Sequence, residues 1–99
     1  MTVHLHGDDD HYEGVDEQQF LRNCFGVVLR ARSADDPHIA VYHCEQDDDN
    51  WYLRPGYSSH WIDEMIDTLR QAKAWMQEHA EPEKTGHGYM FKTRQERSA

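Results

Sequence analysis

The sequence predicts one α+β domain, with a short N-terminal helix, a three-stranded antiparallel meander and one long C-terminal helix packed on one sheet face. Three observations support this prediction. A single long segment repeats apolar residues at helical spacing, three shorter β-rich segments alternate with turn residues, and a helix-capping pattern precedes them. A chain of 99 residues has room for one domain with a modest core.

The long helix is expected over residues 58–79. Ser58 and Ser59 are suitable N-cap residues, and the residue before Pro82 is driven out of helical geometry, which ends the helix. Apolar side chains recur at steps of three and four residues, as expected for a helix with one buried face. The members of this stripe are Ile62, Met65, Ile66, Leu69, Ala72 and Met76.

Three strands are expected at residues 25–32, 38–45 and 51–54, joined by polar turns, which favours an antiparallel meander. If the first hairpin closes about Asp35, Val27 lies opposite His43. If the second closes about Asp48, Leu53 also lies opposite His43. These registers place the apolar residues of all three strands on one face, where the long helix can cover them.

A short helix is expected over residues 15–23. Asp16 is a suitable N-cap, Gln19 completes a capping box, and Val15 can pack against Phe20 as a hydrophobic staple. The domain itself is assigned to residues 15–81, after a flexible acidic and His-rich N-terminus at 1–14. Residues 82–99 form a basic tail, in which 88–91 provide either an extra edge strand or part of a disordered segment.

The strand registers place several cationic and aromatic side chains on the outer sheet face, away from the long helix. Arginine and tyrosine are enriched in protein interfaces, and they can also stack bases and hold phosphates of a single strand. The third interpretation is a solvated face whose arginines pair with nearby carboxylates. The expected binding residues are Arg30, Arg32, Tyr42, Tyr52 and Arg54.

A second candidate site lies in the N-terminus, where His4, His6 and His11 accompany the acidic run 8–10. Imidazole and carboxylate ligands suit Zn, Ni or Cu, so these histidines are candidate metal ligands. A flexible polar segment is the simpler interpretation, and no cofactor is expected.

Net charge limits the classes of function. The chain carries 19 acidic and 10 basic residues, for a net charge of −9, and residues 1–50 account for the whole imbalance. An acidic half argues against tight binding of duplex DNA and favours solubility or a basic partner. No glycine-rich phosphate loop, Ser-His-Asp arrangement or CxxC pair is evident, so no enzymatic activity is expected.

The sequence therefore predicts a small acidic interaction or regulatory protein that is not an enzyme and forms a homodimer through the outer sheet face. The alternative is a single-stranded nucleic-acid-binding module that uses the same face. No signal peptide and no apolar run of membrane-spanning length is evident, so a cytoplasmic protein without membrane contacts is expected.

Overall fold

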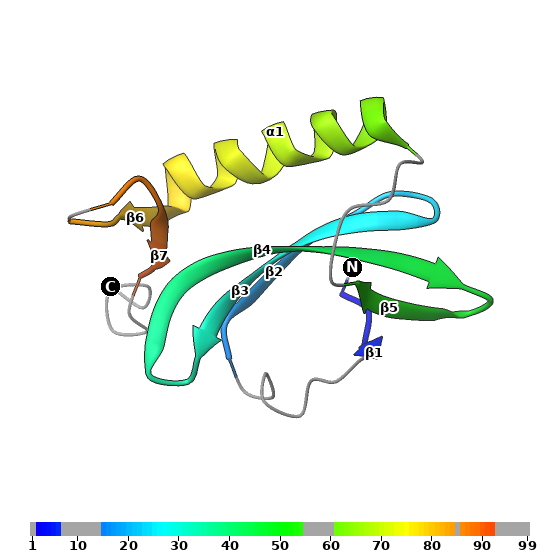
Figure 1. Cartoon of the computed structure of the whole chain (residues 1–99), viewed down its shortest axis with the longest axis horizontal. Helices are drawn as coiled ribbons and strands as arrows, with labels where there is room; N and C mark the ends of the chain where they lie inside the picture. Colours follow the sequence, from blue (N-terminus) through cyan, green and yellow to red (C-terminus); the bar gives the residue numbers. More distant parts are fainter. Residues whose placement is uncertain (1, 7–14, 55–60, 85, 93–99) are drawn as a thin grey trace.

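The computed structural model describes residues 2–6, 15–54, 61–84 and 86–92. Within these ranges the chain forms a strongly curved sheet of seven strands, with one helix lying across one of its faces (Figure 1). Its elements are β1 (Leu5–His6), β2 (Glu17–Leu21), β3 (Phe25–Ser33), β4 (Asp36–Asp47), β5 (Asn50–Arg54), α1 (Ile62–His79), β6 (Ala80–Pro82) and β7 (Tyr89–Phe91).

The main sheet has the strand order β1-β5-β4-β3-β2, and β7 joins it by pairing with both β4 and β6. β1 runs parallel to β5, whereas the other pairs are antiparallel. The prediction of a three-stranded meander is therefore wrong, because the protein builds a mixed sheet of seven strands over its described residues. The extra strands come from the segment predicted to be a short helix and from the two terminal parts of the chain.

The predicted N-terminal helix is also wrong, because most of that segment forms β2. Phe20 packs against the core under α1, whereas the neighbouring Leu21 packs on the opposite face of the sheet. This alternation is the two-residue period of a strand. The capping signals were local, and the cross-strand pairing with β3, which includes Gln19 opposite Val28, outweighed them.

The first hairpin has the predicted register, with Val27 opposite His43 and Leu29 opposite Val41. The second hairpin differs from the prediction by one residue, because Leu53 lies opposite Cys44 rather than His43. Its turn is shorter than expected, since Asp47 pairs with Asn50 and only two residues lie between them. A slip of one residue sends every β5 side chain to the other face of the sheet.

The observed α1 begins at Ile62, and the predicted caps Ser58 and Ser59 lie outside the described residues. Arg22, in the turn between β2 and β3, fixes the orientation of the helix. Its Nε donates a 2.8 Å hydrogen bond to the Thr68 hydroxyl, which in turn donates to the carbonyl of Glu64 at 2.7 Å. The helix thereby lies over β2 and β3, and Thr68 is fully buried.

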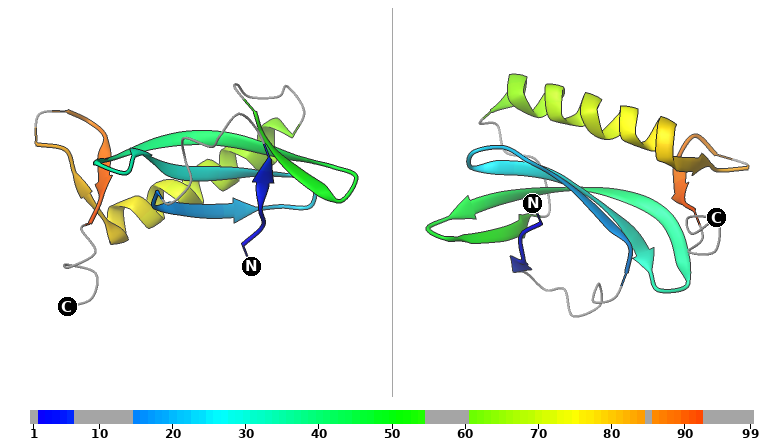
Figure 2. Two further views of the ribbon diagram at one scale, coloured as in Figure 1. Left: turned by 90° about the horizontal axis from the view of Figure 1, so that it is seen from below. Right: turned by 180° about the vertical axis from the view of Figure 1, so that it is seen from behind.

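Two hydrophobic clusters form the core, one on each face of the sheet. Under α1 lie Phe25, Val27, Leu29, Ala31, Met65, Ala72 and Phe91. On the outer face lie Leu5, Val28, Cys44 and Trp51. The views in Figure 2 show α1 on one side of the curved sheet and β1 on the other, so both faces have a covering segment.

His38, near the start of β4, connects the C-terminal hairpin to the main sheet. Its backbone pairs with Met90 of β7. Its Nδ1 lies 2.5 Å from Oδ1 of Asp36, and its Nε2 lies 3.7 Å from Oε1 of Glu83, in the loop after β6. The imidazole therefore lies between two carboxylates from different parts of the chain.

Candidate interaction surface

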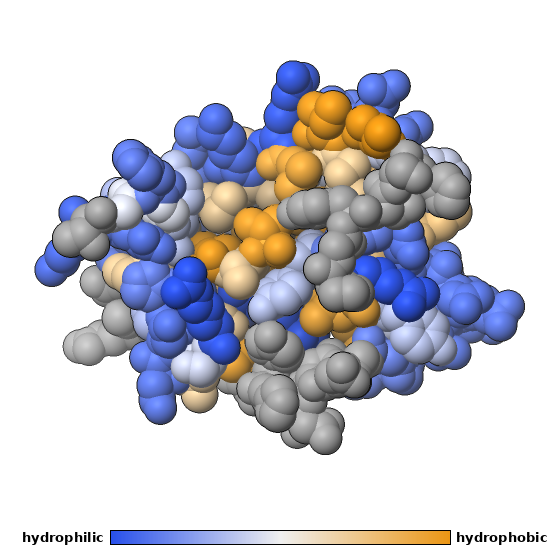
Figure 3. All heavy atoms as spheres, in the orientation of Figure 1, coloured by the Kyte–Doolittle hydropathy of each residue, from blue (hydrophilic) through white to orange (hydrophobic). Residues whose placement is uncertain are grey.

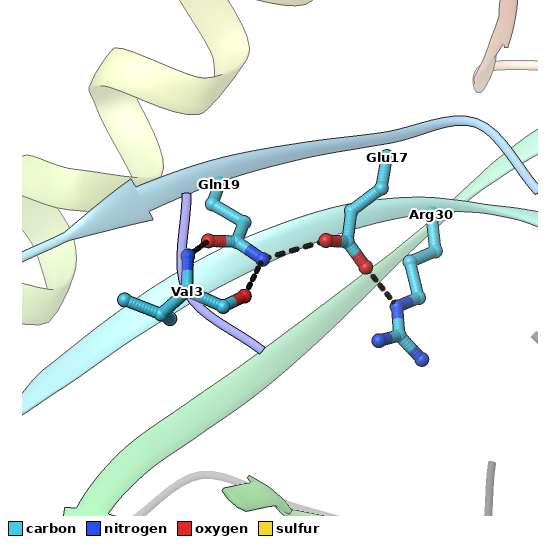
Figure 4. A network of polar contacts seen from close by, with 4 residues as sticks. All are labelled: Val3, Glu17, Gln19 and Arg30. Atoms are coloured by element: carbon cyan, nitrogen blue, oxygen red, sulfur yellow. Dashed lines mark hydrogen bonds and ion pairs between the residues drawn. The ribbon is translucent and has the colours of Figure 1, made fainter. Parts of the chain in front are cut away.

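The predicted binding face, on the outer side of the sheet, is partly covered by the N-terminal segment. β1 pairs with β5 at one end of the strand order, and Val3 reaches β2 at the other end. The Gln19 side chain bonds both backbone groups of Val3, with its Oε1 accepting from the amide at 2.9 Å and its Nε2 donating to the carbonyl at 2.9 Å (Figure 4). The Gln19 side-chain amide thus makes the two hydrogen bonds that the backbone of a neighbouring strand would make with Val3.

Arg30 lies on this outer face but is not available as a surface cation. Its Nε donates to Oε1 of Glu17, whose other carboxylate oxygen accepts a 2.6 Å bond from Gln19 (Figure 4). Arg30 is only 6% exposed. The pair is typical of a structural ion pair, in which each charge is held by hydrogen bonds.

The remaining predicted residues are not brought together on one face. Tyr42 is half-buried beside the outer-face cluster, and Arg32 is exposed near the end of β3. Tyr52 and Arg54 lie on the opposite side of the sheet, because Tyr52 pairs with Glu45 and Arg54 with His43. The prediction that all five residues share the outer face is therefore wrong, and the one-residue shift of β5 is the cause.

Tyr52 lies beside His6, a residue of the second predicted site. The ring centroids of His6 and Tyr52 are 5.4 Å apart, and those of His4 and His6 are 4.9 Å apart. The Arg54 guanidinium lies 5.3 Å from the centre of the Tyr52 ring, and its Nε is 3.4 Å from Oε2 of Glu45. A mixed polar and aromatic strip results, in which Glu45 partly neutralises the arginine.

The described residues do not form a metal centre. Over the ranges given above, no three His, Cys, Asp or Glu side chains are close enough together to hold an ion. His4 and His6 are neighbours on one side of β1, and the third candidate, His11, lies outside the described residues.

Among the described residues, a different group of exposed apolar side chains lies on the helix side of the sheet. Ile62 is 57% exposed, Ile66 44% and Trp61 44%, although a helix normally buries such side chains. Arg22 holds the Thr68 flank of α1 over β2 and β3, and helical geometry puts Ile62 and Ile66 on the other flank of α1.

Strand β4 contributes Val41 to the same side, and this residue is 38% exposed. Figure 3 shows hydrophobic side chains extending from the N-terminal half of α1 down toward the sheet. We call Trp61, Ile62, Ile66 and Val41 the apolar surface. Trp61 stacks on Phe25 of the core, with ring centroids 6.0 Å apart and ring planes inclined by 15°.

The helical repeat predicts that Ile62 and Ile66 are buried, and this prediction is wrong because both side chains are exposed. The six apolar positions of the stripe span an arc of about 120° around the helix, which is an ordinary width for one buried face. The apolar repeat alone therefore gave no sign that Ile62 and Ile66 stay exposed. The apolar repeat also leaves out Thr68, which is fully buried and is bonded by Arg22.

No protein-family model matches this chain, and no curated protein or solved structure shows significant similarity to it. In the part of the chain that the structure describes, α1 is not apolar enough to cross a lipid bilayer.

Proposed function

We propose that the protein is a small acidic interaction protein, not an enzyme, which acts through protein contacts and forms a homodimer through the apolar surface. The exposure of Ile62 and Ile66 is the observation on which this proposal depends. Contiguous exposed apolar side chains on a small soluble domain are typical of interaction sites. Burying an isoleucine side chain is worth about 1.5–3 kcal/mol, which is enough to contribute substantially to association.

The partner that we propose for this uncharged surface is a second copy of the chain. Each copy carries a net charge of −9, so two copies repel each other over most of their surfaces. The four side chains of the apolar surface are uncharged, and they offer a contact in which no like charges need to meet. A twofold arrangement would place Ile62 and Ile66 of one copy against the same residues of the other.

Single-stranded nucleic acid is the weaker alternative. That interpretation needed Arg30, Tyr52 and Arg54 on one open face, but Arg30 is buried against Glu17 and the other two lie across the sheet. A cytoplasmic location is part of the proposal. It is compatible with Cys24 and Cys44, which are both free thiols.

Sedimentation at micromolar concentration tests the proposal. We expect a monomer–dimer equilibrium that Ile66→Glu weakens at least tenfold, because it brings a carboxylate into the apolar contact. Ala74→Glu is the matched control, since Ala74 is exposed on another part of α1 and receives the same charge. A monomeric wild-type protein, or equal weakening by both substitutions, would contradict the proposal.

A further inference from the structure

A cleft of about 340 Å³ lies at the other end of α1 from the apolar surface. Its lining comes from the start of β2, the last turns of α1 and the end of β7. The lining residues are Asp16, Glu17, Gln18, Trp75, His79, Phe91 and Lys92. The volume is at the lower end of the range for small-ligand sites, and it suits one ring system with a small substituent.

Aromatic rings form one side of this cleft. Trp75 is half-buried, and its ring meets Phe91 edge to face, with centroids 6.0 Å apart and planes at 64°. His79 lies on the next turn of the helix, with its ring centroid 5.2 Å from that of Trp75. Phe91 is 5% exposed and belongs to the core under α1, so the indole is held in place by a rigid neighbour.

Hydrogen-bond donors and acceptors also line the cleft. Gln18 has the same strand parity as Phe20, which packs under α1, so its side chain is directed to the helix side of β2. Its amide both donates and accepts hydrogen bonds, and the neighbouring Asp16 carboxylate accepts them. Lys92 adds an ammonium donor from the end of β7.

We propose that this cleft binds an adenine-type ring, as a free nucleoside or as part of a nucleotide. Base–indole stacking is worth about 1–3 kcal/mol and requires a flat ring. A glutamine amide can bond the N6 amino group and N7 of adenine together, and a carboxylate accepts from an exocyclic amino group. The ligand is thus recognised by stacking on Trp75, by hydrogen bonds with the Gln18 amide, and by a hydrogen bond that its amino group donates to the Asp16 carboxylate.

The charges around the cleft favour the base over the phosphate. Asp16 offsets Lys92, and Glu78 lies 3.8 Å from His79 at the same end of the helix. The C-terminal end of α1 also carries partial negative charge. Adenosine is therefore expected to bind at least as tightly as its monophosphate, and a short single-stranded oligonucleotide more weakly than either.

Tryptophan fluorescence can test this inference when Trp75 is the remaining tryptophan, in a Trp51→Phe, Trp61→Phe background. Adenosine should cause saturable quenching, and uridine, which lacks the exocyclic amino group, should bind at least tenfold more weakly. Gln18→Ala should weaken adenosine about tenfold, the loss of roughly one good hydrogen bond. Asp16→Asn, which keeps the side-chain shape, should reduce the preference for adenosine over uridine.

Gln77→Ala is the control, because Gln77 is exposed on α1 and does not line the cleft. It should leave the affinity for adenosine unchanged. No saturable response to adenosine, equal affinity for uridine, or equal effects of Gln18→Ala and Gln77→Ala would overturn the proposal. Binding of the monophosphate or the oligonucleotide without binding of adenosine would overturn it as well, because phosphate would then be the recognised group.

Discussion

The two thiols of the chain have opposite environments. Burial raises the pKa of Cys44 to about 12, and the nearby carboxylates of Glu17 and Glu45 act in the same direction. Because the thiolate is the reactive form, Cys44 should not react with a disulfide reagent at neutral pH while the protein is folded. Cys24 is exposed in the turn between β2 and β3. Thiol titration should therefore give one fast equivalent in buffer and two in denaturant.

The same pKa shift makes a prediction for alkaline pH. A pKa raised in the folded state stabilises the fold below the ordinary thiol pKa, and this contribution is lost as pH rises toward 12. Cys44→Ala should therefore reduce the loss of stability between about pH 8 and pH 10. A second fast-reacting thiol at neutral pH, with the protein folded, would contradict this account of Cys44.

The pair of Glu17 and Arg30 should be strongly coupled. Glu17→Ala removes the carboxylate that holds a buried guanidinium, and such losses cost about 3–5 kcal/mol when the pair is fully buried. Glu17 is partly exposed, so we expect about 2 kcal/mol by urea unfolding. Arg30→Met in the same chain should recover much of that loss. If the two substitutions are simply additive, the ion pair does not have the role that the geometry assigns.

Single residues also show why the sequence was misleading. Gln19 stands where a capping box needs it, yet its amide bonds the backbone of Val3, sixteen residues away. Thr68 is a polar residue beside the apolar stripe, yet it is hydrogen-bonded to Arg22 and Glu64 and is fully buried. Val3 and Arg22 are distant in sequence from Gln19 and Thr68, so no local pattern could reveal these contacts.

At the scale of elements, the C-terminal hairpin should be sensitive to acid. The hydrogen bond from the His38 side chain, and then that from its backbone amide, hold the pKa of Asp36 below its ordinary value. A lowered pKa stabilises the fold above the ordinary carboxyl pKa, and the contribution is lost as pH falls through the lowered value. Asp36→Asn should therefore reduce the loss of stability between about pH 5 and pH 2.

Asp35→Asn is the control for this prediction, because it changes the same charge at the exposed neighbouring position. Amide exchange of β7 gives the more local measurement, since β7 is held to the main sheet at His38 and Met90. Asp36→Asn should increase exchange at β7 more than at β3. Equal acid dependence in the wild type and in Asp36→Asn would show that this contact does not stabilise the hairpin.

Strand positions could be predicted better than strand registers. The three central strands follow β-rich runs, and the first hairpin has the register that its hydrophobic pattern required. In the second hairpin the alternation of Trp51 and Leu53 suits either face, because both faces of this sheet have a hydrophobic cluster. The one-residue slip could not be excluded from a pattern that assumed one buried face.

At the scale of the whole molecule, the sequence pattern predicts one sheet face covered by the long helix and one open face. The N-terminal segment covers part of the outer face instead, through Leu5 and Val3, and the opening is on the helix side, beside α1. Because the outer face is partly covered, we propose self-association through the apolar surface instead of through the outer sheet face. The apolar surface and the cleft at Trp75 lie at opposite ends of α1, so substitutions should affect them independently.

The salt dependence of self-association tests the central claim most directly. Two copies that each carry a charge of −9 repel, and salt screens this repulsion while leaving an apolar contact intact. Sedimentation at about 0.05 M and about 0.5 M salt should therefore show tighter dimerisation at the higher concentration. A protein that is monomeric at both concentrations, or a dimer that salt weakens, would contradict self-association through the apolar surface.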